Sequence, residues 1–256
     1  LDKLKTLAVQ VSGDSPRPEP INIEFIKEIE NKEGNERLLD ILLQKDDLLA
    51  KFTDWSAKAK LVSAREPLWT LLVDLNNHAP DEPEMEQLKI ETSAIKDDRL
   101  LLQEPDLVQP ILTAITDKLQ IILNKRKEQY NGLYDLRMAD LLANEYFKKV
   151  TPEQQRSVLD KHQLLEKPEI KALDAHALLN QLQNASLYTW DTKIAALPGQ
   201  FQSALEDAIL LSAPEAKTYS LPRKTISNQA EIDSYVAELK TELETLLKVA
   251  SSIILK

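Results

Sequence analysis

Apolar residues recur every three or four positions along most of the chain, the spacing of helices that bury one face. A stripe from Leu112 to Leu141 predicts one long helix over 106–150, and a second long helix is expected over 35–64, with Pro67 breaking or kinking the chain after it. The pattern predicts a mainly α protein, an elongated multi-helix bundle with long antiparallel helices. On the helix over 35–64 we expect a buried apolar face made by Leu38, Ile41, Leu42, Leu48, Leu49 and Phe52.

Proline and capping residues divide the rest of the chain. Pro16, Pro18 and Pro20 predict an extended segment, so residues 1–20 are expected to be a linker or the end of a preceding domain. Residues 21–150 are expected to form the long-helix bundle, and residues 151–256 a smaller helical region. Shorter helices are expected over 22–31, 84–95, 151–161, 173–182 and 187–211, the last with a break at Pro198-Gly199.

The C-terminal segment changes character. Residues 219–226 predict an irregular edge strand, Asn228 begins a helix with Glu231 three residues on, and residues 252–255 predict a second strand. Strand, helix and strand in this order form a βαβ unit. Two short strands are not stable alone in water, so we expect them to lean on the helical body or to add a third strand, from residues 7–11 or from a partner.

Composition narrows the functions that the chain can carry. It has four isolated glycines, none followed by lysine, which excludes a P-loop and a Rossmann fingerprint. It has no cysteine, which excludes thiolate chemistry and Cys-based zinc sites, and its net charge of −10 disfavours non-specific binding to nucleic acid. No apolar run approaches the length of a membrane span, so a cytoplasmic location without membrane contact is expected. Leu1 in place of an initiator methionine suggests a processed chain or a fragment of a longer one.

Few residues stand out as chemically functional. His78, His162 and His176 have no second ligand at helical spacing, so neither a metal site nor a catalytic site is expected. The acidic stretch 74–106 is expected to be mostly solvated, with a docking surface for a basic partner as the alternative. Charge decoration is the expected role of the basic residues, and contact with a partner or with nucleic acid is the alternative for six of them: Lys118, Lys125, Arg126, Lys127, Arg223 and Lys224.

Four phrases in order carry a resemblance to a known family. These are residues 99–108 (RLLLQEPDLV), 130–142 with 151–156 (TPEQQR), 196–201 (ALPGQF) and 220–226 (SLPRKTI). They resemble the C-terminal region of the BrxC family (also called PglY-like), the large P-loop proteins of bacterial BREX systems for bacteriophage exclusion. The resemblance covers most of residues 22–256, and none of its phrases is catalytic.

The resemblance implies a non-catalytic helical region of a phage-defence ATPase, coupling that ATPase to partner proteins or to its own oligomer. The P-loop module would lie N-terminal to this region, so ATP and Mg²⁺ are expected only there and no cofactor is expected here. The implied partners are other BREX-type proteins or further copies of the chain, with DNA reached only through a complex. The alternatives are a helical adaptor from an unrelated bacterial system, a nucleic-acid-binding helical module, and an enzyme whose site assembles only in three dimensions.

Overall fold

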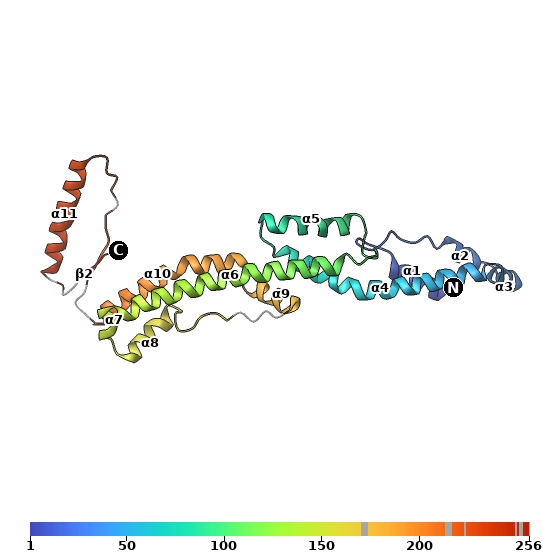
Figure 1. The fold of residues 1–256 in the computed structure, drawn as a ribbon, viewed down its shortest axis with the longest axis horizontal. Coiled ribbons are helices and arrows are strands. Elements are labelled where there is room, and N and C mark those ends of the chain that lie inside the picture. The colour runs from blue at the N-terminus through green and yellow to red at the C-terminus, as the bar shows by residue number, and fades with distance from the viewer. Residues whose placement is uncertain (170–173, 213–216, 223, 249, 251–252, 256) are drawn as a thin grey trace. The chain divides into compact units, whose positions relative to one another are not determined.

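The computed structural model describes residues 1–169, 174–212, 217–222, 224–248, 250 and 253–255. Three quarters of these described residues are helical, in eleven helices, and they contain one small sheet of two parallel strands (Figure 1). The predicted mainly α class is therefore confirmed. The chain forms two compact units, residues 1–126 with 170–188 and residues 127–169 with 189–256. This division falls within two long helices, whereas the sequence pattern placed a boundary between residues 150 and 151.

The first unit is built around one long helix. This is α4, and α1 packs along it (Figure 1). Residues at the start of α6 and α10 also belong to this unit. The helices that begin in it are α1 (Asp2–Val11), α2 (Glu24–Glu30), α3 (Gly34–Leu43), α4 (Lys45–Asn77), α5 (Pro83–Asp97), α6 (Val108–Ala143), α9 (Ala175–Asn184) and α10 (Leu187–Ser212).

Helix α1 corrects the expectation that residues 1–20 are a linker. Leu4, Ala8 and Val11 of α1 are buried in one apolar cluster with Ile26 of α2 and Trp55 of α4. The segment 7–11, expected as a candidate strand, is helical, because Leu4, Ala8 and Val11 form an apolar stripe spaced four and three apart. The proline-rich part after Val11 forms bends and a turn, so the extended linker expected there is wrong as well, and α1 belongs to the core of the first unit.

Of the break or kink expected at Pro67, the break is wrong, because α4 continues through that residue. A proline inside a helix removes one backbone hydrogen bond and costs about 3 kcal/mol. Trp55 and Val62 before it and Trp69 and Leu72 after it are all buried. The burial of these four side chains stabilises the helix on both sides of Pro67 and offsets the lost hydrogen bond. The same holds for α10, which continues through Pro198 while Leu197 and Phe201 are buried.

Arg65 of α4 joins the helix to the loop that precedes α6. Its guanidinium is almost fully buried and donates hydrogen bonds to the carbonyl oxygens of Leu101 (3.1 Å) and Gln103 (2.8 Å). It also contacts the carboxylates of Glu104 (2.6 Å) and Asp106 (3.5 Å). One buried side chain therefore satisfies the backbone of a loop that has no regular structure of its own.

The second unit packs the remainder of α6 against the remainder of α10 through aromatic side chains. Tyr130 and Tyr134 of α6 stack with ring centroids 6.2 Å apart. Trp190 meets Tyr130 edge-on at 5.9 Å, and Phe201 meets Tyr134 at 5.5 Å. The Tyr134 hydroxyl donates to the Leu164 carbonyl at 2.6 Å, which fixes the loop after α8. The further elements of this unit are α7 (Glu145–Lys149), α8 (Pro152–Lys161), β1 (Lys217–Tyr219), α11 (Gln229–Leu247) and β2 (Ile253–Leu255).

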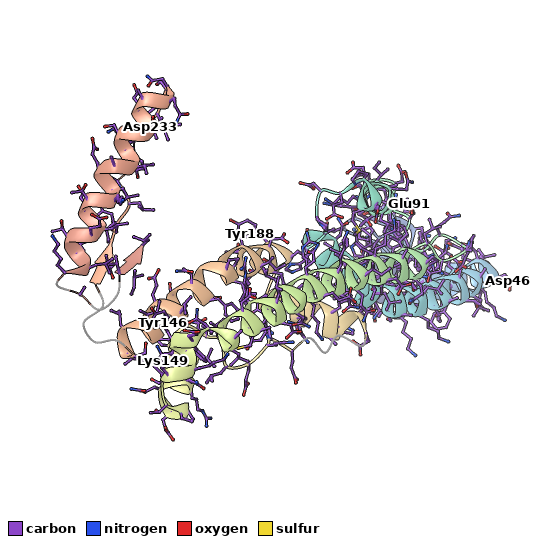
Figure 2. All side chains as sticks on the ribbon, turned by 60° about the vertical axis from the view of Figure 1, so that its left-hand side comes forward. Asp46, Glu91, Tyr146, Lys149, Tyr188 and Asp233 are labelled. Atoms are coloured by element: carbon purple, nitrogen blue, oxygen red, sulfur yellow. The ribbon has the colours of Figure 1, made fainter. Side chains whose placement is uncertain are left out.

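Side-chain caps begin two helices of this unit. Thr151 accepts from the backbone amide of Gln154, whose side chain accepts in return from the Thr151 amide, so α8 begins with a capping box. Asn228 caps α11 by accepting from the amide of Glu231. In α7 the Lys149 ammonium lies 5.2 Å from the centre of the Tyr146 ring (both are labelled in Figure 2). The Thr151 and Asn228 caps satisfy amides that have no partner inside the helix.

Candidate interaction surfaces

Helix α3 carries the most exposed apolar surface of the first unit. None of its ten residues is buried, and four leucines are 61–77% exposed: Leu38, Leu39, Leu42 and Leu43. We call these four residues the leucine face. Ile41 is the residue of α3 that packs against the core cluster of the unit. The expectation that Leu38 and Leu42 belong to a buried face is therefore wrong.

The beginning of α4 extends this exposed apolar surface. Leu49 and Phe52 were expected in the core with Leu48, yet Leu49 is 53% and Phe52 39% exposed, while Leu48 is buried. Single exposed apolar residues are ordinary on protein surfaces, whereas several together mark binding sites or aggregation risks. The sequence held one signal for this outcome. Two adjacent leucine pairs, at 38–39 and 42–43, make an apolar arc wider than a single neighbouring helix covers.

The second candidate surface is formed by β1, α11 and β2 at the C-terminal end of the chain. Strands β1 and β2 pair in parallel with Thr218 opposite Ile254, and α11 connects them, so the predicted strand–helix–strand unit is confirmed. The first strand, Lys217–Tyr219, shares only Tyr219 with the strand expected over 219–226, so that prediction is wrong in its position. Residues 7–11 lie in α1 and supply no third strand.

Helix α11 covers the strands incompletely. None of its residues is buried, and Ile232, Val236 and Leu247 are 41–54% exposed (Figure 2 shows the side chains that stand out from it, Asp233 among them). On the strand side Ile254 is buried. Parallel sheets normally have both faces covered. A two-stranded sheet with one helix therefore leaves a strand edge and an apolar helix face available to a further chain.

A tyrosine ties the first strand to this helix. The Tyr219 hydroxyl donates to the Glu242 carboxylate, which raises the pKa of Tyr219 to about 12. Tyr235 donates to the carbonyl of Pro222 at 2.9 Å. These two contacts hold the extended segment after β1 beside the helix.

The six basic candidates are distributed over both units. Lys118 of α6 donates to the Glu84 carbonyl, and Arg126 lies 3.6 Å from the Glu82 carboxylate. Lys224 lies 3.4 Å from Glu238 and 6.0 Å from the centre of the Tyr235 ring. Each of these three cations thus has a partner in its own chain.

The other three basic candidates differ. Lys125 is exposed and Lys127 half-buried on α6, at neighbouring positions that point to different sides of the helix. Arg223 lies outside the described residues. The structure does not bring the described candidates together into one basic patch, and contact with nucleic acid stays a prediction for them.

One histidine takes part in a charge cluster that the sequence pattern did not indicate. The Asp207 carboxylate of α10 accepts from Lys161 at 2.6 Å and lies 2.8 Å from His162 Nε2. Burial alone would raise the pKa of Asp207, but the hydrogen bonds with Lys161 and His162 outweigh it and hold that pKa below its usual value. The cluster joins the end of α8 to α10, which is a structural role.

The described residues show neither a membrane-spanning helix nor a cluster of metal ligands. Among them, no helix combines the length and the apolar character needed to cross a bilayer, and no three His, Asp or Glu side chains gather as a metal site would require. Comparison with known proteins found no matching family model, no similar curated protein and no similar solved structure. The exposed apolar surfaces of α3 and of α11 with its two strands are therefore the features that bear on function.

Proposed function

We propose that this chain is a non-catalytic interaction and assembly region of a large bacterial ATPase of the BrxC type, acting in the cytoplasm in defence against bacteriophages. It couples the ATPase to other BREX-type proteins or to its own oligomer. The observation that carries the proposal is that two helices, α3 and α11, have no buried residue and yet present leucine, isoleucine and valine side chains to solvent. Exposed apolar faces of this kind are typical of surfaces that a partner covers.

The shape of the two surfaces supports the proposal further. A helix with an apolar face can pack against a helix or a groove of another protein, and an open parallel strand edge can accept an extended segment. The resemblance of the ordered phrases to the BrxC family supports the parent protein proposed here. ATP and Mg²⁺ belong, in this proposal, to a P-loop module encoded N-terminal to the chain.

The parent gene and its phage phenotype test the proposal. The reading frame should encode a P-loop lysine upstream of this region. In bacteria that carry the complete system, deleting the codons for residues 21–256 should abolish phage exclusion, measured as plating efficiency, while the purified remainder still hydrolyses ATP. A reading frame without a P-loop, or full exclusion after the deletion, would refute the proposal.

A pair of substitutions separates the role of α11 from general instability. Ile232→Glu with Val236→Glu places charges on its exposed apolar face without emptying a buried site. Co-purification with the other proteins of the same gene cluster should fall at least tenfold, and helix content should be unchanged. The matched control is Ser234→Glu with Thr241→Glu, which adds the same charge at two exposed positions on the opposite side of the same helix. An equal loss in both variants would point to charge rather than to apolar contact.

A further inference from the structure

The four residues of the leucine face are arranged symmetrically along α3. Two adjacent pairs, 38–39 and 42–43, are separated by Asp40 and Ile41, so the order of leucines is the same from either end of the helix. The Asp40 side chain does not interrupt the leucine face, because it forms an ion pair with Lys32 of its own chain. At 100° per residue the four leucines occupy one continuous side of the helix. A surface with this symmetry is complementary to a copy of itself turned end over end.

We infer that the leucine face is the contact between two copies of this chain, in which α3 of one copy packs antiparallel against α3 of the other about a two-fold axis. The inference rests on the proposed function and deepens it by naming the partner. A two-fold contact requires that if residue i meets residue j, then j meets i. Antiparallel pairing centred between Asp40 and Ile41 satisfies this, because Leu38 comes level with Leu43 and Leu39 with Leu42 of the second copy.

The charges at the two ends of α3 agree with this orientation. In the antiparallel pair, Glu36 near the start of the helix comes level with Lys45, just past the end of the helix in the second copy. The same pairing of levels recurs at the other end by symmetry. A parallel pair would instead place Glu36 level with Glu36 and Lys45 level with Lys45. Opposite charges at matching levels favour the antiparallel arrangement over the parallel one.

The exposed area is sufficient for a specific dimer. At the exposed fractions of 61–77%, the four leucines offer roughly 450 Å², within the range of the largest apolar patches on monomeric proteins. Complete coverage of two such faces would bury roughly 900 Å² as an upper bound, and coverage of Leu49 and Phe52 of α4 as well would raise that bound to roughly 1,200 Å², the lower end of specific interfaces. Because α3 has no buried residue, association covers its leucines without any rearrangement of the core.

Sedimentation equilibrium of the full 256-residue chain tests the inference. The unmodified chain should be a dimer at micromolar concentration. Leu38→Glu with Leu42→Glu should weaken the dimer roughly 100-fold or more, since both copies then carry buried charges at the centre of the contact. Circular dichroism should show unchanged helix content, because neither leucine is buried in the monomer. The control is Leu136→Glu with Leu142→Glu, two comparably exposed leucines of α6, which should leave the dimer intact.

Cysteine cross-linking tests the antiparallel orientation. The chain has no cysteine, so introduced thiols are its only ones. A mixture of Leu39→Cys and Leu42→Cys chains, oxidised under mild conditions, should form the mixed disulfide dimer in preference to either homodimer. A Val9→Cys chain, with its thiol exposed on α1, should not cross-link at the same protein concentration.

Two results would overturn the inference. One is a monomeric chain at about 100 μM, above the micromolar concentrations at which the dimer is expected; the other is a dimer that survives Leu38→Glu with Leu42→Glu. If the monomeric chain still binds a protein of its gene cluster, the inference fails while the proposed function stands. If the chain dimerises through α3 but its parent gene has no P-loop, the dimer stands and the proposed function fails.

Discussion

Replacing Arg65 with methionine tests how the loop before α6 is held. Methionine keeps most of the length and packing of the arginine side chain but removes every donor. The Leu101 carbonyl, which is buried, would lose its side-chain donor at a cost of about 1–3 kcal/mol. The contacts to Glu104 and Asp106, whose side chains are 65% and 31% exposed, contribute about 0–1 kcal/mol each. Together these losses amount to about 1–5 kcal/mol.

The assay is urea unfolding followed by circular dichroism. For a unit of this size the expected loss lowers the urea midpoint of the first unit by about 1 M. Hydrogen exchange supplies a local measurement, because the Leu101 amide donates to the Pro16 carbonyl at 3.2 Å and should exchange faster once the loop loosens. The control is Arg137→Met, at a side chain that is 45% exposed and 3.7 Å from Asp140, where the change should stay within about 0.5 kcal/mol.

One outcome would refute the reasoning. Removing a buried guanidinium also removes the cost of taking its charge out of water, and an apolar replacement is sometimes as stable as the ion pair it replaces. If Arg65→Met is as stable as the unmodified chain and the Leu101 amide stays protected, the desolvation of Arg65 outweighs its hydrogen bonds. The loop would then be held by apolar packing, chiefly of the buried Leu101 side chain.

Two further predictions concern the second unit. Thr151→Ala should destabilise it by about 1 kcal/mol in urea unfolding, because the amide of Gln154 loses its cap, while Thr151→Ser should be nearly neutral; equal effects would show that the hydroxyl does not matter. Asp207→Asn should cost about 1–2 kcal/mol at neutral pH through the lost charged hydrogen bonds. Because the pKa of Asp207 is lowered by folding, its contribution is present above the unfolded value near 3.8 and is lost as pH falls through the folded value. The stability difference between Asp207→Asn and the unmodified chain should accordingly shrink in acid, and a difference independent of pH would contradict the assignment.

Much of the local structure could be predicted from the sequence, for reasons visible at particular residues. Thr151 with Gln154, and Asn228 with Glu231, cap helices through contacts only three residues apart, so no distant part of the chain is needed to form them. The strand–helix–strand order at the C-terminus was equally recoverable, because its elements follow one another directly.

The predictions that the structure corrects, at residues 7–11 and at Pro67, have one cause in common. Residues 7–11 alternate like a strand yet also continue a helical stripe, and only packing against α4 selects the helix. A proline such as Pro67 usually ends a helix, but buried neighbours on both sides keep α4 continuous through it. Local preferences worth a few kcal/mol were outweighed in both places by tertiary burial.

By itself, then, the sequence determined the helical class, the caps, the absence of a phosphate-binding loop and the apolar stripes that need covering. It did not determine which stripes are covered inside the chain. Leu48 and Leu49 are adjacent and equally apolar, yet the structure buries the first and exposes the second. Burial depends on where a neighbouring element lies, which is a property of the packed chain and not of a residue's own chemistry. Only the tertiary structure could therefore separate the leucines that form the core from those left for a partner.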